Sequence, residues 1–216
     1  MMGLAKRGLL AGLCVTLLSS GVARSVPPAF QGTQGPVPPA VAERMRAHSW
    51  REGCPVPIAE LAYLRLSHHG RDGVVREGEL IVHRELAAEV LAIFKVLFDL
   101  KFPVDKMRLI DVYHGDDDRS MADNNTSGFN CRPVAGNPKV LSKHAYGRAI
   151  DINPLWNPML ANGEVLPPAG AAYANRDKAA PGILRKGDPA VREFNGRGWT
   201  WGGDWVALKD YQHFQK

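Results

Sequence analysis

The sequence lacks a hydrophobic run long enough to span a membrane. The apolar run near its start, from Gly8 to Leu18, is shorter than the about 20 residues that a bilayer requires. The sequence also lacks a concentrated stripe of lysine and arginine, which argues against nucleic acid as a partner. No internal repeat is present.

The amino-terminal residues have the features of a secretory signal. Lys6 and Arg7 precede the apolar run, and small residues follow it up to Ala23. This order predicts a signal peptide over residues 1–23 and export to the periplasm or the extracellular space. A membrane anchor is the alternative. Cleavage removes two cations and no acid, so the formal charge falls from +5 to +3, which suits work near anionic cell-wall polymers.

Cysteine is scarce, with three residues in the chain. Cleavage after Ala23 would remove Cys14 and leave only Cys54 and Cys131 in an oxidising compartment. A disulfide between these two is the natural inference, and two separate buried thiols are the alternative.

Composition and periodicity divide the remaining chain. Residues 24–40 are rich in proline and glycine, which predicts a flexible leader before a single domain at 41–216. Residues 59–86 alternate in short apolar runs and predict an antiparallel ribbon. Apolar residues then recur at three- and four-residue steps, which predicts a helix over 84–101.

The second half of the chain has weaker signals. Strands are expected over 107–114, 126–134 and 141–154, and a long surface excursion over 153–187. Asp188 and Pro189 are typical of a helix start, so a short helix should run to about Asn195. Two short strands around Gly202 and Gly203 should close the chain.

The polar residues of "LSKHAYGRAIDINP" raise the question of a metal site. His144 and Asp151 have opposite parity in an unbroken strand, but a turn at Gly147 can bring the histidine back toward the aspartate. "DYQHF" near the end of the chain adds His213 and Asp210. Three N/O ligands with an open position are typical of hydrolytic zinc sites. His144, Asp151 and His213 would then be ligands, and Asp210 would be free to act as general base.

Together "SKHAYGRAID", "WGGDW" and "DYQHF" resemble the zinc D-Ala-D-Ala carboxypeptidase and L-alanyl-D-glutamate endopeptidase family, whose pattern is SxHxxGxAxD followed by (D/E)xxH. Every position of that pattern is filled here. The resemblance implies an α+β hedgehog/DD-peptidase-like domain, with an antiparallel sheet carrying the zinc cleft and helices packed on the other face. It also implies Zn²⁺ held by His144, Asp151 and His213, with Asp210 as acid/base.

The family's carbonyl-polarising arginine is harder to place, because the Tyr-Arg-Ser motif of many relatives is absent. Arg132 on the neighbouring expected strand takes this role in our interpretation, and Arg119 is the reserve. The polar run from Ser120 to Ser127 suggests substrate contacts through Ser120 and Asn125, with Ser142 as a third. The acids Asp116–Asp118 are interpreted as a solvated loop.

The expected function is zinc-dependent hydrolysis of peptidoglycan stem peptides by a monomer. The terminal D-Ala-D-Ala bond is the first choice, and the L-Ala-D-Glu bond is the alternative. A zinc-stabilised binding module is a more distant alternative, which the free acid Asp210 disfavours. A serine hydrolase built on Ser142 is also disfavoured, because its surroundings lack a nucleophile-elbow glycine pattern.

Overall fold

A computed structural model describes residues 28–216, so the expected signal peptide lies outside the described residues. The fold is α+β and its sheets are almost entirely antiparallel, which confirms the expected class. Several small sheets replace the one sheet that was expected, and the pair β4 (Lys106–Met107) and β5 (Asn125–Thr126) is parallel. Nowhere in residues 28–216 does a helix have the length and apolar character needed to cross a bilayer.

The largest sheet is formed by β1 (Gly32–Pro36), β2 (Leu61–His69) and β3 (Val75–His83). Strands β2 and β3 form the expected antiparallel ribbon, paired from Leu61 with His83 to His69 with Val75. Helix α1 (Pro39–His48) precedes this ribbon and packs through Val41 and Met45 in a small core beside it.

Helix α2 (Ala87–Asp99) packs on this sheet and confirms the expected amphipathic helix. A short 3-10 turn, Arg84–Leu86, leads into it. The apolar residues that recur at three- and four-residue steps are the buried ones, including Val90, Ile93 and Leu97.

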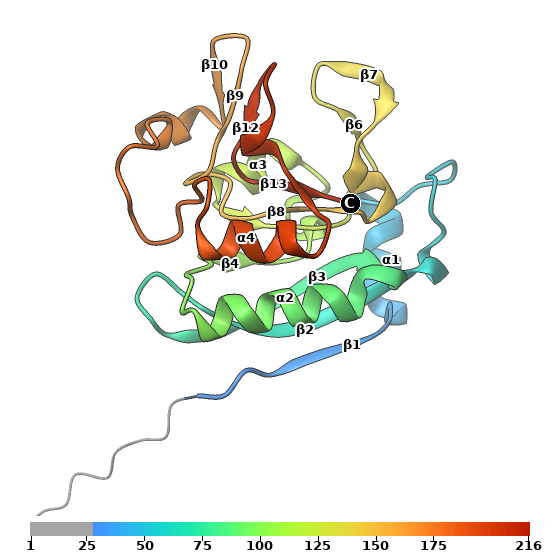
Figure 1. Ribbon diagram of the computed structural model, residues 1–216. Coiled ribbons are helices and arrows are strands. Elements are labelled where there is room, and N and C mark those ends of the chain that lie inside the picture. The colour runs from blue at the N-terminus through green and yellow to red at the C-terminus, as the bar shows by residue number, and fades with distance from the viewer. Residues whose placement is uncertain (1–27) are drawn as a thin grey trace, which may run out of the picture.

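A second layer contains the carboxy-terminal strands. Strand β13 (His213–Gln215) pairs with both β11 (Thr200–Trp201) and β8 (Ala149–Asp151). Helix α4 (Pro189–Gly196) packs against β13, where the rings of Phe194 and Phe214 are stacked with centroids 4.0 Å apart. Helices α2 and α4 lie side by side between the two layers, and one hydrophobic core joins them all (Figure 1).

Two hairpins rise on the same side of the second layer (Figure 1). One consists of β6 (Pro133–Val134) and β7 (Asn137–Leu141). The other consists of β9 (Met159–Ala161) and β10 (Glu164–Leu166), to which β12 (Lys209–Asp210) adds a third strand. The excursion expected over 153–187 is therefore partly ordered into a sheet, and a 3-10 turn at Pro168–Tyr173 follows it.

Several expected strands are shorter than predicted. Residues 107–114 contain only the end of β4 and a 3-10 turn, Ile110–Tyr113. Helix α3 (Asp117–Ala122) follows. Residues 126–134 are largely irregular, and a 3-10 turn interrupts 141–154 at Lys143–Tyr146. The core in this region is made by packed turns, which leave no periodic pattern in the sequence.

The second half of the expected flexible leader is ordered. Residues 32–36 form the edge strand β1, and α1 begins at Pro39. The β1 side chains are mostly exposed, and its pairing with β2 depends on backbone hydrogen bonds, so proline and glycine content gave a misleading signal. Proline is tolerated here because Pro36 ends an edge strand.

A disulfide joins Cys54 and Cys131, with a Cα–Cα distance of 6.1 Å, and confirms the expected pairing. It fastens the turn before β2 to the segment that leads into β6. The Arg51 guanidinium strengthens this junction by donating a 2.7 Å hydrogen bond to the carbonyl of Cys131. The residue after Cys131 is Arg132, so this junction also fixes the main chain at the proposed catalytic arginine.

Candidate metal centre

His144 is positioned by a tight turn. Ser142 caps this turn, its hydroxyl accepting a 3.3 Å hydrogen bond from the His144 N–H. Gly147 ends the turn with a φ of 65°, and a Cβ there would lie 2.5 Å from the backbone nitrogen of His83. The turn therefore requires glycine for both its dihedral angle and the close approach of β3.

Asp151 and His213 are brought together by strand pairing. They are direct partners in the antiparallel register of β8 with β13, although 62 residues separate them in the chain. Ile150 and Phe214, the next partners in the same register, are fully buried and fix it.

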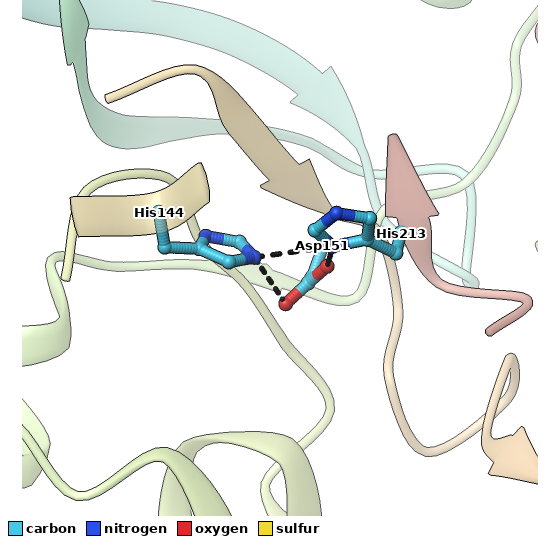
Figure 2. Close-up of side chains that lie close together, drawn as sticks. All are labelled: His144, Asp151 and His213. Carbon is cyan, nitrogen blue, oxygen red and sulfur yellow. Dashed lines mark hydrogen bonds and ion pairs between the residues drawn. The ribbon is translucent and has the colours of Figure 1, made fainter. Parts of the chain in front are cut away.

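The three side chains form one buried cluster (Figure 2). The Asp151 carboxylate is shared: Oδ2 lies 3.0 Å from Nε2 of His144, and Oδ1 lies 2.9 Å from Nδ1 of His213. The two imidazole nitrogens are 3.3 Å apart. The sequence prediction that these residues meet is thus supported by their geometry.

The outward-facing ring nitrogens have acceptors of their own. Nδ1 of His144 donates to the carbonyl of Gly128 at 2.6 Å, and Nε2 of His213 donates to Oε1 of Gln215 at 3.1 Å. These acceptors place the ring protons on the far side, so each ring directs a lone pair at the cluster. Two lone pairs facing one carboxylate repel one another unless a cation joins them.

The donor set fits a zinc ion. Two nitrogens bound to a tetrahedral zinc at about 2.0–2.1 Å lie about 3.3 Å from one another. That is the separation found between His144 and His213. The set of two imidazoles and one carboxylate, each imidazole held by an outer acceptor, is also the composition of hydrolytic zinc sites.

Electrostatics at the cluster favour a bound cation. Burial alone would raise the pKa of Asp151, but His144 and His213 hold it well below its usual range. Burial would lower the pKa of His213, but the hydrogen bond and charge of Asp151 outweigh it and raise that pKa to about 9. Without a metal, a proton on His213 takes the place of the cation.

Asp210 lies beside the cluster without joining it. Its Oδ1 atom is buried and has no hydrogen-bond partner in residues 28–216. The pKa of Asp210 is raised to about 6, chiefly by burial. The charge of Asp151 also raises this pKa, and the charge of His213 opposes the rise. Gly202 packs on Asp210, where a Cβ would lie 2.5 Å from the Asp210 carbonyl oxygen. A buried carboxylate without a partner is costly, which is typical of a functional group.

Arg132 is held by an acid that the sequence interpretation assigned to a solvated loop. Nη2 of Arg132 lies 2.7 Å from Oδ2 of Asp117, and both side chains are mostly buried. Burial raises the pKa of Asp117 and Arg132 lowers it, and the charges of Asp151 and His144 also act on it. The pair is therefore close to the cluster. Arg119, the reserve candidate, is exposed on α3.

The three expected substrate contacts have structural partners instead. Asn125 donates to the hydroxyl of Ser120 at 3.0 Å and bonds the backbone of Arg108 through both ends of its amide. Ser142 caps the His144 turn. Ser120, Asn125 and Ser142 are all buried. These polar groups replace regular backbone hydrogen bonds in a region of turns, which supports a structural role for them. Contact with substrate stays a prediction.

Gln215 was missed by sequence reasoning, whereas Trp205 is one of three tryptophans for which the sequence leaves core and cleft wall as alternatives. Gln215 orients His213, and its signal was its position two residues further along the same strand. The half-buried ring of Trp205 lies 5.5 Å from that of His213, at a tilt of 55°. Trp199 and Trp201 are buried, with indole N–H groups bonded to Glu89 and to the Tyr211 carbonyl. Of Trp199, Trp201 and Trp205, only Trp205 therefore lies against the cluster in the described residues.

Comparison with known families gives one match. Residues 135–216 match a family model described as D-alanyl-D-alanine carboxypeptidase. The matched segment includes the three clustered residues and Asp210, whereas Asp117 and Arg132 precede it. No curated protein and no solved structure matches the chain.

Proposed function

Because residues 135–216 match a family model described as D-alanyl-D-alanine carboxypeptidase, we propose that this protein is a zinc-dependent peptidase of the peptidoglycan stem peptide. His144, Asp151 and His213 would hold the metal. When bound, zinc supplies a Lewis acid that acidifies water and polarises a carbonyl group. The terminal D-Ala-D-Ala bond is the first candidate, in line with the family description.

One observation carries the proposal: a buried, unpartnered carboxylate oxygen on Asp210 beside the three-donor cluster. A purely structural metal site has no use for such a group. Its pKa of about 6 leaves Asp210 ionised at neutral pH yet basic enough to accept a proton. Asp210 would take a proton from the attacking water and deliver it to the leaving amine.

Arg132 and Trp205 complete the proposed machinery. Arg132 would donate a hydrogen bond to the scissile carbonyl oxygen as negative charge develops there, and Asp117 would hold the guanidinium in place. Trp205 would form one wall of the cleft next to His213 and exclude water from it. The amino-terminal apolar run supports export to the compartment where this substrate lies.

The test is digestion of purified peptidoglycan fragments by the protein without residues 1–23, with products identified by mass. We expect release of one D-Ala, loss of activity with a chelator and recovery with zinc. A product carrying a newly freed L-Ala carboxylate would instead identify an endopeptidase. Hydrolysis that persists after complete metal removal would contradict the proposal.

Asp210→Asn separates catalysis from metal binding. The variant should keep its zinc content and its melting temperature but lose about 100- to 10 000-fold in kcat, because the amide cannot accept the proton. Asp204→Asn is the matched control, since Asp204 is an exposed acid of the preceding turn. Full activity in the Asp210 variant would rule out its role as acid/base.

A further inference from the structure

A cavity of about 530 Å³ lies beside β12, away from the metal cluster. Its lining includes five charged side chains and one tyrosine, namely Arg176, Arg185, Lys186, Asp188, Lys209 and Tyr211. Lys209 and Tyr211 flank Asp210 in the chain, and both line the cavity whereas Asp210 does not. The cavity is therefore lined by the two chain neighbours of the proposed catalytic base.

Arg176 forms no salt bridge with a carboxylate of residues 28–216. All four of its described hydrogen bonds end on uncharged oxygens: the carbonyls of Trp156, Tyr173 and Leu184, and Oδ1 of Asn157. The Nε atom is buried without a partner in residues 28–216. Burial of the guanidinium away from water lowers its pKa to about 10.

The neighbouring cations add to this positive field. Lys209 donates to two backbone carbonyls, those of Gly203 and Trp205. Arg185 and Lys186 each form an ion pair, with Asp188 at 3.7 Å and with Asp204 at 3.3 Å. Arg176 and Lys209 therefore contribute the excess positive charge.

Four cationic side chains thus surround a cavity whose lining contains one carboxylate, Asp188. An anion there would gain charge-assisted hydrogen bonds and would compensate the half-buried guanidinium. The ring of Tyr211, 4.6 Å from the Arg176 guanidinium carbon, gives the cavity a flat apolar wall. The site therefore fits a compact anionic group attached to a larger molecule.

We propose that this cavity binds a carboxylate or phosphate group of an anionic cell-wall polymer. Such a site would hold the wall against the protein close to Asp210, the proposed base. It supplies an affinity for the wall that the catalytic cluster does not. The proposal rests on the proposed function for the identity of the polymer, but anion binding itself is measured without hydrolysis.

The test uses the metal-free protein, residues 24–216, at low ionic strength. It is titrated with inorganic phosphate and, separately, with acetate, and binding is measured by calorimetry. Removing the metal prevents anions from binding at the cluster. We expect saturable binding of one anion. Replacing two cations of the lining together, Arg185→Ser with Lys186→Ser, should weaken it about tenfold because each loses a charge-assisted contact.

The matched control is Arg46→Ser with Lys95→Ser, which removes the same net charge from exposed positions on α1 and α2. If both double variants bind the anion equally weakly, the loss comes from net charge alone and the proposed site is wrong. The proposal is also wrong if neither anion shows saturable binding. Preference for phosphate would identify a phosphate-bearing polymer, and preference for acetate would identify peptide carboxylates.

Discussion

Two carboxylates of the site, Asp151 and Asp210, are chemically identical but differ in their surroundings. Asp151 has an imidazole against each oxygen, so its pKa is held far down and it remains an anion. Asp210 has a buried oxygen without a partner, and its pKa rises to about 6. Groups whose environments push their pKa values apart take different chemical roles. The proposed ligand and the proposed base are therefore distinguished by packing rather than by residue type.

The proposed carbonyl-polarising role of Arg132 can be tested directly by substitution. Arg132→Lys should lower kcat about 100-fold and change KM little, because lysine keeps the charge but loses the planar guanidinium that Asp117 orients. Steady-state kinetics on a stem peptide gives both constants. Arg119→Lys, at the exposed reserve position, should leave them unchanged. A defect confined to the Arg119 variant would reverse the assignment.

At the scale of elements, sequence reasoning succeeded where periodicity or a motif was strong. The ribbon β2–β3, helix α2 and helix α4 follow from spacing and capping residues. Two short motifs predicted that His144, Asp151 and His213 would meet, because the residue types and their order in the motifs constrain the chemistry.

The failures have physical causes. Strand β1 has no buried face to give it a pattern, and Asp117 meets Arg132 through turns whose course no periodicity records. The same applies to Ser120 and Asn125, which bond one another inside a folded turn region. Contacts that depend on irregular backbone are specified by long-range packing, so local sequence did not reveal them.

The turn that carries His144 gives a prediction at this scale. Gly147→Ala should lower the free energy of unfolding by about 2 kcal/mol or more beyond the loss in Gly163→Ala. Both glycines have positive φ, 65° and 81°, but only at Gly147 does a Cβ meet backbone atoms, at 2.5 Å, whereas the Gly163 site is open. Urea denaturation of both variants measures the difference. Equal losses would show that the close approach of β3 is unimportant.

At the scale of the whole molecule, metal binding and stability should be linked through pH. In the metal-free protein the raised pKa of His213, about 9, means that its protonated form stabilises the fold. This contribution is complete below the unfolded value of about 6.5 and is lost as pH rises through about 9.

The melting temperature of the chelator-treated protein should therefore fall as pH rises from 6.5 to 9. The corresponding loss in the free energy of unfolding is on the order of 1–3 kcal/mol. The zinc-loaded protein should change less over the same range, because the metal replaces the proton. In the metal-free His213→Gln variant, the melting temperature should no longer fall with pH over this range. A metal-free protein whose melting temperature is independent of pH in this window would contradict the His213–Asp151 pairing.

The two hairpins that rise above the second layer have a consequence for how such a protein changes over generations. The β6–β7 hairpin precedes His144, and the β9–β10 hairpin follows Asp151, so each is an insertion next to a ligand-bearing element and not within it. Lengthening or replacing either tip leaves the β8–β13 register, and with it the metal cluster, unchanged. Descendants of one ancestor could thus inherit the same proposed site and differ in the substrate they bind by exchanging surface loops alone.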